Sequence, residues 1–173
     1  MSALGSTGHF QALSRVLKQR FSQNVLSAKA LQVEDGLAEY SITWVQFNAS
    51  TNLRLNVDDQ ILEIATTSQN LQLPEGGGDN LAVFLSKLQA DVPFGHMQVD
   101  TAGGQVYYRS GQLLGGIGDS EELIYFHLFL HSKLFPLLDR YFTLALSYSF
   151  DDRSIDNLLD SLRKSIAEAK LDL

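Results

Sequence analysis

Residues 37–67 read LAEYSITWVQFNASTNLRLNVDDQILEIATT, and this stretch decides the fold of the chain. Apolar and polar residues alternate through most of it, which is the pattern of half-buried β-strands. Turn-forming residues interrupt the alternation at 48–52 and at 58–59. Turns this short cannot join parallel strands, which need a crossover of about a dozen residues, so we expect an antiparallel meander. Its strands are expected at 37–47, 52–58 and 60–67.

The segments on either side of the meander add helices and one hairpin. Two apolar runs flank the glycine-containing turn 100–104 and predict a hairpin with strands at 96–101 and 104–110. The segment 24–36 stays open between an extension of the first helix and a short strand. Apolar residues recur at three- and four-residue spacing in four further segments, which predicts helices at 8–23, 79–92, 120–148 and from 151 to the C-terminus.

Together these elements predict the fold class α+β. The expected architecture is an antiparallel five-stranded sheet with packed helices, in the order α-β-β-β-α-β-β-α plus an extra C-terminal helix. A chain of 173 residues is long enough for one ordinary domain. We expect a flexible tail over residues 1–7, which are mostly small and polar, and a single α+β domain over residues 8–173.

Composition narrows the classes of function. The chain has a net charge of -7 and no cysteine, so disulfides, thiolate metal sites and cysteine nucleophiles are excluded. Its acidity argues against binding to a phosphate backbone, and we interpret the basic residues Arg15, Lys18, Arg20 and Lys29 as solvated surface. We find neither a secretory signal nor an apolar run of the roughly 20 residues that span a bilayer. We therefore expect a cytoplasmic protein with no membrane and no nucleic-acid partner.

The second half of the chain resembles a known family. The similarity runs from about Asn80 to Phe150 and is carried by the motifs LAVFLSKL (81–88), PFGHMQVD (93–100), GQVYYR (104–109) and LLDRYF (137–142). In these motifs and in element order the chain resembles YbjN-like proteins and type III secretion chaperones. The resemblance implies a secretion-chaperone-like fold, and it implies no agreed activity because the YbjN-like group is uncharacterised. The predicted helix after Asp151 is an addition to the secretion-chaperone pattern.

His127 and His131 are the strongest candidates for a metal site. They lie four residues apart on a predicted helix, so both rings can face one zinc ion. A metalloprotease helix would carry a glutamate after the first histidine, but Leu128 stands there. No third ligand is dictated by spacing. We therefore expect a pair of structural histidines and no bound metal, and we keep a metal-binding protein or metal-dependent hydrolase as the alternative function.

The glycine-rich and acidic segments do not form a recognisable catalytic or cofactor site. Two glycine-rich loops, 76–78 and 115–118, precede predicted helices, where phosphate often binds. Acidic residues adjoin both loops, and no lysine follows as in a P-loop. The acid pairs at 58–59 and 151–152 suit turns and helix caps. We therefore expect no catalytic residue, no cofactor and no small-molecule substrate.

The most informative remaining feature is an excess of apolar surface on the long helix. The run 123–130 is apolar nearly all round, whereas a helix beside a sheet buries only one stripe. Either the C-terminal helix or another protein chain must cover the remainder. The pattern favours a non-catalytic cytoplasmic protein-binding or chaperone-like domain whose partner is another protein or a second copy in a homodimer. The residues that we expect to form this interaction or core surface, the apolar belt, are Tyr125, Phe126, Phe129, Leu130, Leu134 and Phe135.

Overall fold

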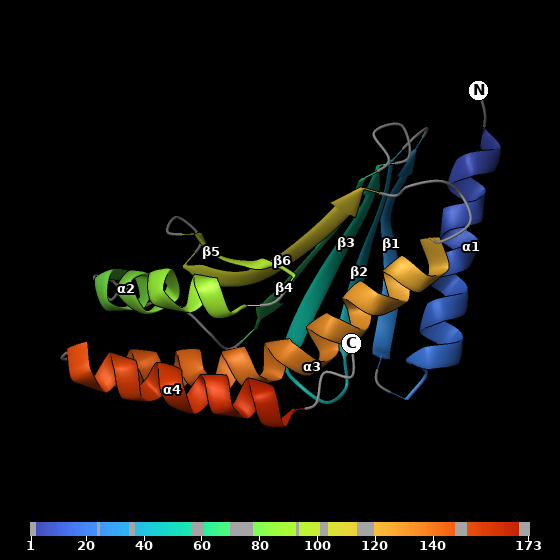
Figure 1. Ribbon diagram of the computed structural model, residues 1–173. Helices are drawn as coiled ribbons and strands as arrows, with labels where there is room; N and C mark the ends of the chain where they lie inside the picture. Colours follow the sequence, from blue (N-terminus) through green and yellow to red (C-terminus); the bar gives the residue numbers. More distant parts are fainter. Residues whose placement is uncertain are drawn as a thin grey trace.

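The structure is a computed structural model with one antiparallel sheet and helices packed against it (Figure 1). It describes residues 3–23, 25–34, 37–56, 61–69, 78–92, 94–100, 104–113, 120–147 and 152–169. In chain order the elements are α1 (Ala3–Arg20), β1 (Val25–Glu34), β2 (Leu37–Trp44), β3 (Ala49–Asn56), β4 (Ile61–Ser68), α2 (Gly78–Leu88), the short 3-10 helix η1 (Gln89–Asp91), β5 (His96–Asp100), β6 (Gln105–Leu113), α3 (Ser120–Ser147) and α4 (Asp152–Glu168).

The α+β class and the antiparallel pairing are confirmed, but the prediction of five strands is wrong. The sheet has six strands in the order β1-β2-β3-β4-β6-β5, and every neighbouring pair is antiparallel. The additional strand is β1, in the segment that the sequence left open. Its pairing with β2 shifts register between Val25 and Ser27 and again between Ala30 and Gln32. Each shift breaks the two-residue alternation by which a strand is recognised in a sequence.

Several element boundaries also differ from those expected. β3 begins at Ala49, because Ser50 and Thr51 pair with β2 although 48–52 reads as a turn. Threonine suits a pleated strand, and here that preference outweighs the turn-forming asparagines. α1 begins at Ala3, earlier than the expected start near residue 8. The expected turn at 58–59 and the glycine-rich loop 115–118 lie outside the described residues, as do residues 76–77 of the other glycine-rich loop.

All four α-helices lie on the same side of the sheet, where α4 packs on α2 and α3. In β2 the buried residues alternate with partly exposed ones, and the buried side chains point toward the helices. One buried cluster lies under α1 and the first half of α3, and a second lies under α2, the second half of α3 and α4. Within the described part of the chain, no helix packs on the opposite face, which we call the open face.

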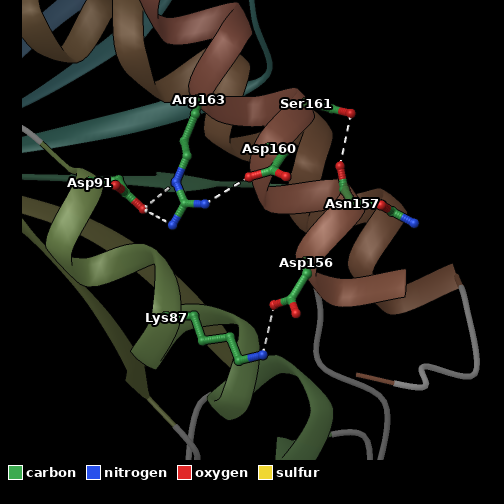
Figure 2. A network of polar contacts seen from close by, with 7 residues as sticks. All are labelled: Lys87, Asp91, Asp156, Asn157, Asp160, Ser161 and Arg163. Atoms are coloured by element: carbon green, nitrogen blue, oxygen red, sulfur yellow. Dashed lines mark hydrogen bonds and ion pairs between the residues drawn. The ribbon is translucent and has the colours of Figure 1, made fainter. Parts of the chain in front are cut away.

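Ion pairs join α4 to α2 and η1 (Figure 2). Lys87 Nζ lies 2.8 Å from Asp156 Oδ1, and Arg163 Nη2 lies 2.8 Å from Asp91 Oδ2. Arg163 also contacts Asp160, one helical turn earlier. Surface pairs of this kind stabilise little, so we assign them to orienting α4. Burial of apolar side chains holds α4 in place. The buried apolar side chains of α4 are Ile155, Leu159 and Leu162.

Gly95 provides a test of how closely β5 and β6 pack. A Cβ atom at this position would collide with the carbonyl oxygen of Arg109 and lie 2.6 Å from the buried ring of Tyr108. We expect Gly95→Ala to lower the free energy of unfolding by about 1–3 kcal/mol, measured by urea denaturation. Gly111→Ala is the matched variant: its Cβ would lie 3.0 Å from Leu62 O and 3.8 Å from two carbon atoms of Glu63, so it is less crowded than at Gly95. A larger loss at Gly111 than at Gly95 would contradict this account.

Candidate functional site

Both candidate histidines lie on the sheet-facing side of α3. His127 is 2% exposed and His131 is fully buried. Their hydrogen-bond partners come from the sheet. His131 Nδ1 lies 2.7 Å from Thr66 Oγ1 of β4. Ser110 Oγ of β6 lies 2.8 Å from His131 Nε2 and 2.8 Å from His127 Nδ1, and His127 Nε2 lies 3.3 Å from Gln112 Oε1.

The hydrogen bonds continue across the sheet beyond Thr66. Thr66 Oγ1 lies 2.5 Å from Thr51 Oγ1 of β3, and Trp44 Nε1 of β2 donates to Thr51 Oγ1 at 2.7 Å. The result is one unbroken series from β2 to the exposed end of β6. We call it the histidine network, and its members are Trp44, Thr51, Thr66, His131, Ser110, His127 and Gln112.

The direction of the network follows from its Gln112 end. Gln112 Oε1 can only accept, so His127 Nε2 carries the proton, and each single-proton hydroxyl then fixes the next role back to Thr51, which accepts from Trp44 and donates to Thr66. Thr66 then donates to His131 Nδ1, which places the proton of His131 on Nε2 and directs it to Ser110. Ser110 donates to His127 Nδ1, and His127 Nε2–H meets the acceptor oxygen of Gln112. Each hydroxyl and each imidazole ring of the network therefore donates one hydrogen bond and accepts one.

Burial keeps both rings neutral. Desolvation and the neighbouring His127 lower the pKa of His131 to about 3. Desolvation also lowers the pKa of His127. The ring of Tyr108 lies 4.5 Å from that of His131, and burial raises the pKa of the Tyr108 hydroxyl, so this group is neutral too. The network thus carries no charge at neutral pH.

This arrangement is suited to holding α3 on the sheet and poorly suited to catalysis. Each ring nitrogen already donates or accepts a hydrogen bond, so neither histidine offers a lone pair to a metal ion. Ser110 is 4% exposed and gives its only proton to His127, which leaves no access for a substrate carbonyl. Among the described residues we find no group of three or more histidines and carboxylates arranged to hold a metal.

Sequence reasoning singled out the two histidines but missed their partners. Thr51, Thr66 and Ser110 occupy positions of their strands that face the helices, where an alternating pattern usually places apolar residues. A polar residue at such a position must find a hydrogen-bond partner. Three polar residues at helix-facing positions of neighbouring strands, together with two histidines on a helix, were the sequence signal that could have predicted these hydrogen bonds.

The apolar belt is mostly core. Leu130, Leu134 and Phe135 are buried in the cluster that α2 and α4 complete. Tyr125 and Phe129 are partly buried against the other cluster. Phe126 meets Phe94 edge to face, with ring centroids 5.2 Å apart. None of the described helices combines the length and apolarity that a membrane-spanning segment needs.

Two helices of this chain cover the belt, at opposite ends of α3. α4 packs on the second half of α3 and shares a buried cluster with Leu130, Leu134 and Phe135. α1 covers the first half, which the sequence did not suggest. Phe21 lies 5.8 Å from the Tyr125 ring, and the Arg20 guanidinium lies 5.2 Å from the same ring. Arg15 adds an ion pair to Glu121 at 2.9 Å.

Removal of one hydroxyl from the network should be costly. Thr51→Val keeps the shape of the side chain, but it leaves Trp44 Nε1 without an acceptor and removes the hydrogen bond that Thr66 accepts. We expect the free energy of unfolding to fall by about 1–3 kcal/mol, measured by urea denaturation. Thr43→Val on the open face is the matched control and should change stability by less than about 0.5 kcal/mol. Equal losses in the two variants would refute the network as a stabilising element.

The network should also make the fold sensitive to acid. A histidine whose folded-state pKa is lowered contributes its full stability above the unfolded pKa of about 6.5, and this stability is lost as the pH falls toward the folded pKa. For His131 that window extends down to about pH 3. Urea unfolding between neutral and acid pH should show a loss of up to about 1.4 kcal/mol per pH unit from this residue. His131→Asn should flatten the slope, and an unchanged slope would contradict the assignment.

Comparison with known proteins adds no relative. No protein-family model matches the chain, and no curated protein matches it. The resemblance to YbjN-like proteins and secretion chaperones therefore stays a prediction.

Proposed function

We propose that this chain is a non-catalytic, cytoplasmic protein-binding domain with a chaperone-like role. The histidine network supports the non-catalytic part, because its buried polar groups are bonded to one another. A general base or metal ligand needs a lone pair that can reach substrate or metal, and neither ring has one in this arrangement.

The observation that supports protein binding is the one-sided sheet. Helices cover one face, so the open face and the ends of the sheet, above all the edge strand β1, stay available to a partner. An edge strand presents unpaired backbone groups, which other polypeptides can recognise. The belt is a poorer binding surface in this state, because α1 and α4 already cover it. A partner, whether another protein or a second copy, would meet the sheet rather than α3.

Binding of unfolded protein tests the proposal directly. We expect the purified chain to slow the aggregation of a reduced model polypeptide, measured by light scattering, while an equal mass of an inert protein does not. A stable complex should appear in sedimentation velocity. Elemental analysis of protein purified without chelator should find no stoichiometric metal. Stoichiometric zinc that is absent from the His127→Ala, His131→Ala double variant, with no effect on aggregation, would replace this proposal by the metal-dependent alternative.

A further inference from the structure

The two edges of the sheet differ in how they are protected. At β5 the side chain of Gln89 caps the backbone, accepting a hydrogen bond from Met97 N at 2.9 Å and donating to Gly95 O at 3.3 Å. β1 pairs only with β2, and among the described residues we find no comparable cap on its free side. On that side every second residue points its N–H and C=O away from the sheet. β1 is therefore the edge open to another strand.

A small hollow lies beside this edge, between α1 and β1. Its volume is about 130 Å³. Ala28 and Ala30 face the helix layer, opposite Ile42 and Tyr40 of β2, yet both are exposed because α1 does not cover them. Their short side chains leave room for longer ones from a neighbouring strand. We call this hollow with the free edge the α1–β1 groove, and its lining residues are Leu13, Ser14, Leu17, Ala28, Ala30 and Tyr40.

The charge around the groove is positive although the protein is acidic overall. Lys18 lies one turn beyond Ser14 on the same side of α1, so it borders the groove. Lys29 lies on the open face of β1, opposite Ser41. Within the described segments neither lysine forms an ion pair, and both are exposed. Because salt screens charges beyond about 8 Å, Lys29 acts on side chains at the open face of a bound segment and Lys18 on its helix-facing side.

We propose that the α1–β1 groove binds an extended peptide that adds to β1 as a further strand, with apolar and acidic side chains in alternation. Successive side chains of a strand point to opposite faces. The apolar ones would lie over Ala28 and Ala30 toward Leu13 and Leu17, while the acidic ones would lie on the open face beside Lys29. This inference rests on the proposed function and specifies the partner's chemistry.

The same features disfavour a second copy of β1 as the occupant. Two β1 strands paired about a twofold axis would bring their Lys29 residues near each other, and like charges across strands destabilise pairing. The register shifts divide β1 into the two short regular sections Ser27–Ala30 and Gln32–Glu34. Either section is enough for a short peptide and too little for a long flat edge-to-edge contact. The groove therefore selects an acidic segment and rejects its own copy.

Blocked synthetic peptides test the proposal on the full chain. The probe alternates Glu with Val, and its control alternates Lys with Val. We expect the Glu–Val peptide to bind more tightly in fluorescence anisotropy, and more weakly as salt is raised. Amide resonances of Ser27–Ala30 and of Leu13–Leu17 should shift on binding. A proline in the middle of the probe should weaken binding, because it removes an N–H from the added strand.

Single variants separate this site from other surfaces. Lys29→Glu should weaken the Glu–Val peptide about fivefold and improve binding of the Lys–Val peptide. Lys164→Glu, the same charge change on the exposed side of α4, should leave both unchanged. Ala28→Leu should reduce binding by filling the groove. Each variant should keep the wild-type melting temperature. If Lys29→Glu unfolds, Lys29→Gln takes its place.

Three results would overturn the proposal. They are equal binding of the two peptides, resonance shifts away from α1 and β1, and a wild-type dimer with β1 amides protected from exchange before peptide is added. If the groove variants still suppress aggregation of the unfolded model polypeptide, the groove assignment fails and protein binding stands. If the wild-type chain binds no polypeptide in either experiment, the proposed function fails as well.

Discussion

Ser110 is the residue through which the sheet holds its central helix. Its hydroxyl accepts a hydrogen bond from His131 and donates one to His127, each at 2.8 Å, so one strand position locates two residues of α3. Rotating or sliding α3 by one residue would leave several buried polar groups without partners. Apolar packing alone tolerates such repacking far better. The histidine network therefore sets the register of α3, and both buried clusters depend on that register.

The one-sided burial of the sheet divides the molecule into a closed half and an open half. On the helix side, α1 and α4 cover the belt of α3, and the polar groups beneath α3 are bonded in series. On the open face the strands present polar and charged side chains, and Arg54 lies between Glu39 and Glu63. A binding function is therefore more natural at the edge of the sheet than at α3, although the sequence directed attention to α3.

Most of the fold could be predicted, and the failures have physical causes. Alternation located three strands of the meander and the hairpin, because side-chain burial in a strand repeats every two residues. β1 escaped because two register shifts interrupt its pattern and because Ala28 and Ala30 carry no apolar signal of an inward face. The histidine spacing was visible, but its interpretation as a structural pair needed Thr66 and Ser110. Coverage of Tyr125 by α1 was not visible in the pattern of either helix.

The sequence by itself determined the α+β class, the antiparallel sense of the meander and the placement of both histidines on one helical face. Each of these follows from residues close together in the chain, through helical and strand periodicity or the length of a turn. Only the tertiary structure decided which groups the histidines meet, which helices cover the belt and which sheet edge is open. Those outcomes depend on contacts such as Thr66 to His131, 65 residues apart, and long-range contacts of this kind leave no periodic trace in the sequence.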